Sequence, residues 1–330
     1  MPDAATSLHA HLLRTPEEEH VAYLQARLRS GIEISAGDVL PEPTNYDVLV
    51  AGRPERKHIE ASPSLRALII PFAGLPAETR ELMLHFPTVS VHNLHHNALA
   101  TAEMAITLLL AAAKAIIPSD RALRGHDWRP RYGPNPTVLL SGKTALILGH
   151  GAVGSRVGTL CRGLGMRVLA TRRSAREAAD GFVHPPGDLQ ALLPQADVLI
   201  VTLPLTEQTE GLIDRHELAL LAPGAILVNV GRGPVVDEAA LFAALHEGSL
   251  RAAGLDVWYR YPDDVASRSD TAPSSYPFEE LDNVVLSPHR AGAGRSEEIE
   301  RTRMAALAAV LNAAADGEPL PNRVDLRAGY

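Results

Sequence analysis

Three polar side chains lie just past the ends of apolar runs of the sequence: Arg232, Asp256 and His289. Each run is typical of a buried parallel strand, and open α/β sheets bind their ligands just past the carboxyl ends of such strands. An arginine there can bind a carboxylate and its neighbouring carbonyl, and a histidine can give a proton to a carbonyl oxygen as hydride arrives at carbon. The structural alternatives are a salt bridge for Arg232, a turn cap for Asp256 and a core hydrogen bond for His289.

A glycine-rich turn, Gly149-His-Gly-Ala-Val-Gly154, stands between a strand pattern and a helical pattern, and a second strand pattern follows. A dinucleotide fingerprint requires this context. Gly149 would allow the tight turn, Gly151 the close approach of a pyrophosphate, and Gly154 the close packing of helix on strand. We expect Ala152 and Val153, at the helix start, to contact the phosphates as well. The alternative is a plain strand-turn-helix.

The end of the second strand indicates which dinucleotide is bound. NAD sites usually carry a carboxylate there for the ribose hydroxyls, whereas this chain has Thr171, Arg172, Arg173 and Ser174. Two guanidinium groups and two hydroxyls suit a 2′-phosphate. The sequence therefore favours NADP(H), with NAD(H) as the second possibility, unless the two arginines are only a solvated surface pair. Asp256 would accept a hydrogen bond from the nicotinamide amide.

Alternating strand and helix patterns predict two α/β units with parallel sheets. In the first unit the predicted strands are Ser7–Leu13, Tyr46–Ala51 and Leu65–Pro71, with a helix over Pro16–Arg29. In the second unit they are Thr144–Leu148, Met166–Ala170, Val198–Leu203, Ala225–Val230, Ala252–Val257 and Asn283–Ser287.

Four further segments connect or follow these units. Ala98–Ile117 is rich in alanine and leucine and predicts one buried helix. Arg121–Pro136 is polar and contains prolines, which indicates a connecting arm. Trp258–Phe278 is irregular and predicts a long loop of the kind that is often functional. Ser296–Ala315 predicts the final helix.

The composition excludes several classes of protein. The chain has 330 residues, of which 46% are hydrophobic, enough for roughly two domains. A net charge of −8 argues against a general nucleic-acid binder, and no apolar run reaches the roughly 20 residues that span a membrane. Cys161 is the one cysteine, so no internal disulfide can form. With no signal-peptide pattern after Met1 and no metal-ligand spacing, we expect a cytoplasmic protein without a bound metal.

Several motifs together resemble the D-2-hydroxyacid dehydrogenase family over nearly the whole chain. They are Asn97–Glu103, Pro204–Ile213, Val228–Gly233 and Val324–Tyr330, in addition to the glycine turn and the polar residues after the apolar runs. The family includes D-lactate, glycerate, phosphoglycerate, formate and phosphite dehydrogenases.

The resemblance implies an α/β fold of two Rossmann-like or flavodoxin-like domains with parallel sheets. The nucleotide-binding domain, residues 99–290, would be inserted into a discontinuous substrate domain made of residues 1–98 and 291–330. The active site would be the cleft between the domains, which closes and excludes water. The arm around Trp128 and the alanine-rich helix would form a two-fold homodimer.

The resemblance also assigns roles to individual residues. Arg232 and His289 would be catalytic, and both would also contact the cofactor. The other cofactor contacts would be Thr101, Leu203, Pro204, Val230, Gly231 and Asp256, besides the glycine turn and the strand end already named. A small anionic substrate would be bound by Ala73, Gly74, His96, Asn97 and Tyr261, the first two through backbone N–H groups.

The chain departs from the family pattern at two places. Tyr261 stands where the family usually has a glutamate, five residues beyond the aspartate. The carboxylate that would orient the catalytic histidine is therefore missing, unless Asp263 or Asp264 replaces it. His95 and His96 stand where a proline-glycine pair is usual, and they could touch an anionic substrate or be ordinary surface residues.

Three functions remain open at this point. The first is NADPH-dependent reduction of a small 2-oxo acid, of the glyoxylate or hydroxypyruvate type, to the D-2-hydroxy acid. The second is a dehydrogenase of a small anion, like the formate and phosphite members, which needs no proton donor to a carbonyl. The third is a non-catalytic NAD(P)-binding sensor or corepressor, which would not need Arg232 and His289.

Overall fold

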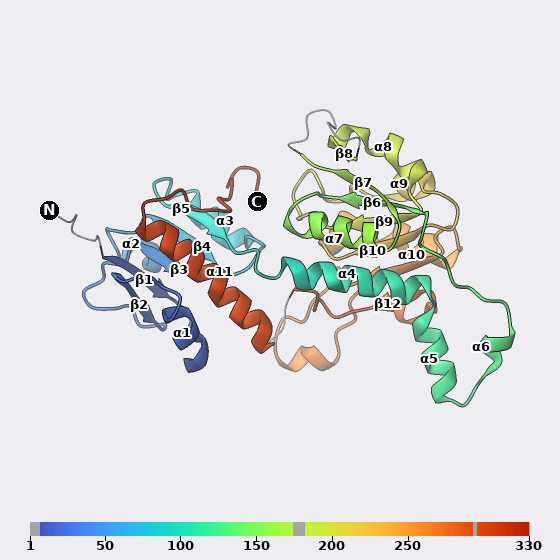
Figure 1. Cartoon of the computed structure of the whole chain (residues 1–330), viewed down its shortest axis with the longest axis horizontal. Helices are drawn as coiled ribbons and strands as arrows, with labels where there is room; N and C mark the ends of the chain where they lie inside the picture. The colour runs from blue at the N-terminus through green and yellow to red at the C-terminus, as the bar shows by residue number, and fades with distance from the viewer. Residues whose placement is uncertain (1–6, 174–181, 293–295, 330) are drawn as a thin grey trace. The chain divides into compact units, whose positions relative to one another are not determined.

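The computed structural model describes residues 7–173, 182–292 and 296–329. The chain divides into two compact units (Figure 1): the smaller consists of Met1–Asn97 and Gly294–Tyr330, and the larger of Ala98–Ala293. The smaller unit is thus discontinuous in sequence. Each unit has its own parallel sheet, with a hydrophobic core on both faces of that sheet.

The smaller unit is built on a five-stranded parallel sheet with the strand order β2-β1-β3-β4-β5. The strands are β1 (Leu8–Leu12), β2 (Ile32–Ala36), β3 (Val48–Val50), β4 (Ala67–Ile70) and β5 (Ser90–Asn93). The sequence predicted β1, β3 and β4 but missed the two edge strands. β2 is largely exposed or half-buried, and β5 buries the polar residues His92 and Asn93, so neither forms the apolar run that indicates a strand.

The described helices of this unit are α1 (Glu18–Gln25), α2 (Arg56–Glu60), α3 (Ala77–Met83) and α11 (Glu297–Ala315). α1 and α11 pack together on one face of the sheet (Figure 1), with Leu24 and Leu311 in their shared core. α2 and α3 contribute to the core on the other face. The predicted helix over Pro16–Arg29 is too long at both ends. α1 begins at Glu18 and ends at Gln25, and the turns that follow it lead into β2.

The larger unit contains a seven-stranded sheet with the order β12-β11-β10-β9-β6-β7-β8, in which all neighbours are parallel. The strands are β6 (Thr144–Leu148), β7 (Arg167–Thr171), β8 (Val183–His184), β9 (Val198–Val201), β10 (Ile226–Asn229), β11 (Ala252–Leu255) and β12 (Val284–Leu286). The six predicted strands are present, several of them shorter than predicted. β8, with two residues, is too short to give a pattern and was missed.

Helices cover both faces of this sheet, as in a doubly wound fold (Figure 1). They are α4 (Ala98–Ala113), α5 (Ile116–Arg124), α6 (Arg129–Tyr132), α7 (Ala152–Gly163), α8 (Leu189–Leu192), α9 (Arg215–Leu220) and α10 (Glu238–His246). α4 and α7 pack on one face, and α8, α9 and α10 on the other. α4 lies so close to β11 that a Cβ atom on Gly254 would come within 2.7 Å of the Leu108 Cβ atom.

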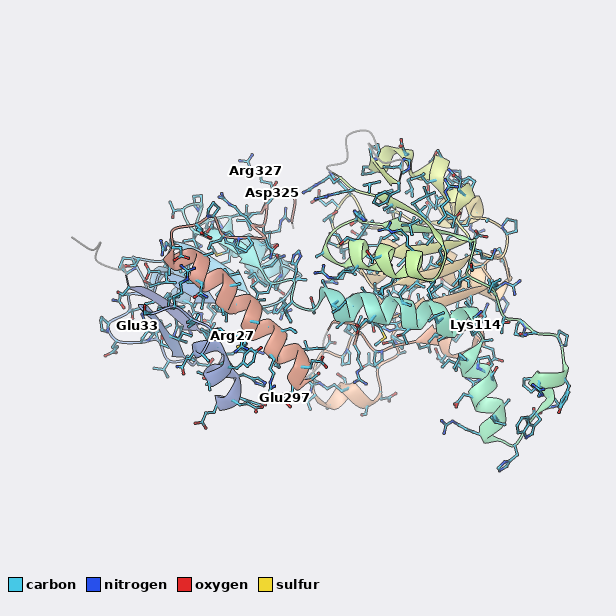
Figure 2. All side chains as sticks on the ribbon, in the orientation of Figure 1. Arg27, Glu33, Lys114, Glu297, Asp325 and Arg327 are labelled. Carbon is cyan, nitrogen blue, oxygen red and sulfur yellow. The ribbon has the colours of Figure 1, made fainter. Side chains whose placement is uncertain are left out.

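The predicted single helix over Ala98–Ile117 is wrong at its C-terminal end. Ala115 has a left-handed backbone, with a φ of 48°, and the chain bends by 65° between α4 and α5. Lys114, at this bend (Figure 2), donates a 2.7 Å hydrogen bond to the backbone oxygen of Val138. The apolar pattern could not reveal the break, because Ile116 and Ile117 continue the run. The predicted arm contains the end of α5 and the whole of α6.

No single helix among the described residues is both long and apolar enough to cross a membrane. α4 and α5 would meet that test only when taken together, across the bend.

Candidate active site

The strand ends of the larger unit bring its predicted site residues to one edge of the sheet, because all of its strands are parallel. The residues that follow the strands are Gly149 after β6, Arg172 after β7, Leu203 and Pro204 after β9, Val230, Gly231 and Arg232 after β10, Asp256 after β11 and His289 after β12. Thr101 lies in the first turns of α4 and is buried. The strand order reverses at β6, and doubly wound sheets bind their ligands at such a point.

The glycine turn between β6 and α7 is closely packed at Gly154. A Cβ atom there would lie 1.9 Å from the backbone oxygen of Gly149, so no other residue fits. Gly149 itself has a φ of 97°, in the region that favours glycine. The Thr202 hydroxyl lies 3.0 Å from the backbone oxygen of Leu148 and 2.7 Å from that of Gly149, and donates to them. Sequence reasoning missed this contact, which ties the turn to the end of β9.

The space around Gly151 is open, whereas the space around Gly154 is filled. A Cβ atom on Gly151 would meet nothing within 4 Å, so a ligand can approach the backbone there. Gly151 precedes α7, whose first N–H groups have no partners within the helix and carry partial positive charge. Ala152 and Val153 provide two of these N–H groups. The turn therefore fits the pyrophosphate of a dinucleotide.

The segment after β7 is exposed and basic. Arg172 and Arg173 both have exposed side chains, and no acidic residue stands at positions 171–173. The Arg172 backbone N–H donates a 2.9 Å hydrogen bond to the backbone oxygen of His184 in β8, which fixes the point where its side chain leaves the sheet. Ser174, also predicted to contact the cofactor, lies outside the described residues. The described positions thus suit a phosphate better than a pair of ribose hydroxyls.

Asn229, at the end of β10, braces the turn that carries Arg232. Its amide group donates a 3.0 Å hydrogen bond to the backbone oxygen of Arg232, and its Oδ1 accepts one of the same length from Gly231. Gly233 is required on the other side, because a Cβ atom there would lie 2.3 Å from the backbone oxygen of Trp258. Burial lowers the pKa of the Arg232 guanidinium, which still carries its charge near neutrality.

The carboxylate of Asp256 is fully buried and holds the loop that carries His289. Its Oδ1 accepts hydrogen bonds from Ser287 Oγ and, at 2.8 Å, from the Arg290 N–H, and its Oδ2 accepts one of 2.9 Å from the Ala291 N–H. These bonds fix the loop on both sides of His289. They occupy three of the roughly four acceptor positions of a carboxylate.

His289 has a φ of 55°, in the left-handed region that few non-glycine residues adopt. Trp258 holds the same loop, because its indole Nε1–H donates a 2.8 Å hydrogen bond to the backbone oxygen of Ser287. Burial and the Arg232 guanidinium lower the pKa of His289, and Asp256 acts in the opposite direction. As the pH rises, the imidazole of His289 therefore loses its proton at a lower pH than an exposed histidine does.

Tyr261 lies beside His289, with 5.4 Å between the ring centroids. Its Oη accepts a 3.0 Å hydrogen bond from the backbone N–H of Trp258, which leaves the proton of the hydroxyl to donate elsewhere. Burial raises the pKa of Tyr261, so the hydroxyl is neutral. Asp264, one of the two candidates to replace the missing carboxylate, accepts a 2.7 Å hydrogen bond from the backbone N–H of Ser267 and serves a local turn.

In the smaller unit, two predicted substrate-binding segments follow neighbouring strands. Ala73 and Gly74 lie in the bend after β4, and His96 and Asn97 lie between β5 and α4. β4 and β5 are parallel neighbours, so both segments leave the same edge of their sheet. Asn93 joins them, because its Nδ2 donates a 2.6 Å hydrogen bond to the backbone oxygen of Ala73.

His96 contacts an arginine that is remote in the sequence. The Nε of Arg303, on α11, donates a 3.3 Å hydrogen bond to the Nε2 of His96. Burial, the charge of Arg303 and the neighbouring His95 together lower the pKa of His96 to about 4. His96 is therefore a neutral side chain near pH 7.

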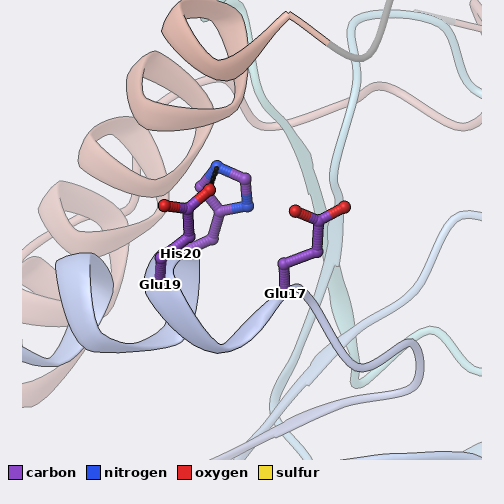
Figure 3. Close-up of side chains that lie close together, drawn as sticks. All are labelled: Glu17, Glu19 and His20. Atoms are coloured by element: carbon purple, nitrogen blue, oxygen red, sulfur yellow. Dashed lines mark ion pairs between the residues drawn. The ribbon is translucent and has the colours of Figure 1, made fainter.

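One group of described residues has ligand atoms close enough to hold a metal ion: Glu17, Glu19 and His20, at the start of α1 (Figure 3). Both carboxylates are exposed, and the Nε2 of the buried His20 lies 3.8 Å from the Oε1 of Glu19. A helix N-terminus stabilises carboxylates through its partial positive charge, and it disfavours a cation for the same reason. The partial positive charge at the start of α1 is therefore sufficient to explain why carboxylates gather there.

Comparisons with known proteins find relatives over most of the chain. The family model described as D-isomer specific 2-hydroxyacid dehydrogenase, NAD binding domain, matches residues 106–291, more than half of the chain. A glyoxylate reductase of Aeropyrum pernix is 41% identical over 233 residues, which cover 68% of this chain and 66%, just under two thirds, of that protein. A glyoxylate/hydroxypyruvate reductase B of Yersinia pestis is 34% identical over 306 residues, which cover 86% of this chain and 88% of that protein.

A solved structure is similar over almost the whole chain. It is a D-isomer specific 2-hydroxyacid dehydrogenase from Xanthobacter autotrophicus Py2 in complex with NADPH and MES, with 27% sequence identity and a TM-score of 0.79. The similarity covers 98% of this chain and 100% of that one.

Proposed function

The chain belongs to the D-isomer specific 2-hydroxyacid dehydrogenase family, and on that premise we propose that it reduces a small 2-oxo acid with NADPH. The observation that carries the proposal is the pair Arg232 and His289, which follow two strands of one sheet on turns that the side chains of Asn229 and Asp256 hold by hydrogen bonds. The names of the Aeropyrum and Yersinia relatives support a substrate of the glyoxylate or hydroxypyruvate type. The NADPH complex of the Xanthobacter relative supports the cofactor.

Arg232 would anchor the substrate. A 2-oxo acid carries a carboxylate beside its carbonyl group, and a planar guanidinium can contact both at once. The brace formed by Asn229 keeps the turn of Arg232 in one conformation. The positive charge of Arg232 also stabilises the negative charge that develops on the carbonyl oxygen during reduction.

His289 would supply the proton. When bound, the dinucleotide supplies a hydride to the carbonyl carbon, and the oxygen then needs a proton to become a hydroxyl group. A protonated His289 can donate it, giving a 2-hydroxy acid of D configuration in keeping with the family. Asp256 and Trp258 serve this step indirectly, because they hold the loop of His289.

The cofactor would be held by the glycine turn and the neighbouring strand ends. Gly151, Ala152 and Val153 would contact the pyrophosphate, and the residue pair Arg172 and Arg173 would contact a 2′-phosphate. NADP(H) is therefore the preferred cofactor, and NAD(H) the second possibility. We propose additional cofactor contacts at Thr101, Leu203, Pro204, Val230, Gly231 and Asp256.

The remaining substrate contacts would come from backbone and neutral groups. Ala73 and Gly74 would offer backbone N–H groups to the carboxylate. Asn97 and Tyr261 would offer neutral hydrogen-bonding side chains. None of these groups carries a negative charge, which suits an anionic substrate.

We also propose that the protein is a homodimer formed through the arm. The arm and the segments on either side of it expose large apolar side chains, among them Ile116, Leu123, Trp128, Tyr132 and Leu139. A group of this kind is typical of an interaction surface, and the resemblance to the family points to a second copy as the partner. Sedimentation analysis should give a dimer for the wild type and a monomer for Trp128→Asp. A monomeric wild type would contradict this assignment.

Tyr261 favours a second candidate function, the oxidation of a small anion such as formate or phosphite. This reaction has no carbonyl oxygen to protonate, so it does not need the carboxylate that Tyr261 replaces. The test is a screen of NADPH and NADH oxidation with glyoxylate, hydroxypyruvate and pyruvate, alongside NADP⁺ and NAD⁺ reduction with formate and phosphite. Turnover of the 2-oxo acids is the expected result. Turnover of formate or phosphite alone would favour the second function, and cofactor binding without turnover would favour a sensor.

A further inference from the structure

His96 is half-buried in the loop between β5 and α4, and its two ring nitrogens have different surroundings. Nε2 accepts the 3.3 Å hydrogen bond from Arg303. Nδ1 is enclosed by protein and has no hydrogen-bond partner among the described residues. The asymmetry matters because a histidine ring has two neutral tautomers, and its partners decide which of them is present.

Arg303 determines the tautomer. A guanidinium group only donates hydrogen bonds, so Nε2 must accept, and the proton of the neutral ring must then lie on Nδ1. Glu300 fixes the guanidinium in turn, because its Oε2 accepts a 2.9 Å hydrogen bond from Nη1 of Arg303. Both side chains of this ion pair are more than two thirds buried, with exposed fractions of 19% for Glu300 and 28% for Arg303. The contact is therefore shielded from the solvent that weakens surface ion pairs.

The Nδ1–H of His96 is consequently a buried donor without an acceptor. Such groups are rare in folded proteins, because the donor has lost its hydrogen bonds to water and gained none. This donor belongs to a segment that follows β5, and the segment containing Ala73 and Gly74 follows the neighbouring β4. The contact between Asn93 and Ala73 holds these two segments together. The position therefore lacks an acceptor atom in the described part of the chain.

We propose that the Nδ1–H of His96 donates a hydrogen bond to a carboxylate oxygen of the substrate, and that Arg303 is the positioning residue that selects this tautomer. The proposal rests on the proposed function and assigns a specificity role within it. The donor is neutral, so it requires an acceptor oxygen at one position and brings no charge of its own. The histidine pair that replaces the family's usual proline-glycine pair thus supplies a directional contact.

The tautomer can be observed without any turnover. Long-range proton–nitrogen correlation spectra of ¹⁵N-labelled protein distinguish a protonated ring nitrogen from an unprotonated one. The chain has 14 histidines, and the His96 signals are those lost in His96→Gln. We expect Nδ1 to be protonated and Nε2 unprotonated in the wild type at neutral pH. Arg303→Met should give a mixture of both tautomers, because Nε2 is then free to carry the proton.

A matched control lies on the same helix. Arg301 forms a 2.6 Å ion pair with Glu297 near the start of α11, and both side chains are more than half exposed. Arg301→Met removes the same charge from α11 and should leave the His96 signals unchanged. A wild-type ring protonated on Nε2 would overturn the assignment, and so would a tautomer that Arg303→Met does not alter.

The contact with substrate is tested by two variants and a titration. His96→Phe should lower kcat/KM for glyoxylate roughly ten- to a hundredfold, the usual range for a hydrogen bond to a charged group, with the KM for NADPH unchanged. His96→Gln keeps an N–H donor and should lose less. NADPH binding and the melting temperature of both variants show whether they are folded.

In the titration, glyoxylate is added to the wild type together with NADP⁺, so that no turnover occurs, and the His96 Nδ1–H signal should move. An unmoved signal and an unchanged kcat/KM in His96→Phe would overturn the proposal. If the wild type reduces no 2-oxo acid, the proposed function fails, and the titration still decides whether His96 binds a carboxylate.

Discussion

The ring of Tyr261 lies 5.4 Å, centroid to centroid, from the ring of His289, where the resemblance to the family would place a glutamate carboxylate. Tyr261 cannot supply negative charge, because burial raises the pKa of its hydroxyl. The imidazolium form of His289 therefore lacks one source of stabilisation. Burial and Arg232 lower the pKa of His289 further, and only Asp256 opposes them.

Reductase activity should therefore be greatest on the acid side of neutrality. In the proposed reaction the protonated form of His289 donates the proton, and its population falls as the pH rises through a pKa that lies below the ordinary histidine value. We expect kcat/KM for the 2-oxo acid to fall with increasing pH above that pKa. Tyr261→Glu should extend the activity to higher pH, and Tyr261→Phe, which adds no charge, should not. A wild-type profile that stays flat into the alkaline range would mean that another acid, such as Asp263, pairs with His289.

Cofactor preference should depend on Arg172. Its side chain leaves the end of β7, where NAD-specific sites have a carboxylate. Arg172→Ala should raise the KM for NADPH roughly ten- to a hundredfold, because a charge-assisted contact is lost, and should leave the KM for NADH nearly unchanged. Arg167→Ala, at the opposite end of the same strand, is the matched control. Equal use of NADPH and NADH by the wild type would contradict this prediction.

Substrate anchoring should depend on the planar group of Arg232. Arg232→Ala should lower kcat/KM for a 2-oxo acid by at least about a hundredfold, because charged hydrogen bonds to the carboxylate are lost. Arg232→Lys should recover only part, since an ammonium group cannot make the two-point contact. NADPH binding, followed by fluorescence, should survive in both variants. Arg290→Ala is the control from the same edge of the sheet, and full activity of Arg232→Ala would place the anchor elsewhere.

The loop of His289 should depend on the indole N–H of Trp258. Trp258→Phe keeps an aromatic ring in the core beside Phe278 but removes the 2.8 Å hydrogen bond to Ser287. We expect kcat to fall roughly two- to tenfold, the usual effect of a neutral hydrogen bond, while the dissociation constant for NADPH stays the same. The exposed Trp128 offers the control Trp128→Phe, which should keep the wild-type kcat. A wild-type kcat in Trp258→Phe would show that Asp256 alone is sufficient to hold the loop.

The sequence indicated the strand ends of the larger unit well, because strands buried on both faces are apolar throughout and the polar residues begin where they end. It did not indicate β2 and β5, whose edge positions admit exposed or polar residues. The break after α4 was hidden as well, since it depends on the backbone of Ala115 and not on a change of residue type.

Contacts between distant segments were the least predictable part of the site. The pattern Gly254-Leu-Asp256 placed the aspartate at a strand end, but its bonds come from Ser287, Arg290 and Ala291. His96 and Arg303 are 207 positions apart in the sequence, and they meet because α11 returns to the smaller unit's sheet. Such pairs arise from packing and leave no local signal in the chain.

The most direct test of the central claim is the rate of NADPH oxidation with glyoxylate, measured for the wild type and for His289→Asn with identification of the product. The wild type should form one glycolate for each NADPH oxidised. His289→Asn should lower kcat roughly a hundred- to ten-thousandfold, the usual contribution of a general acid, with NADPH affinity retained. Wild-type protein that oxidises no NADPH with glyoxylate or hydroxypyruvate would contradict the account, and so would a His289→Asn variant as fast as the wild type.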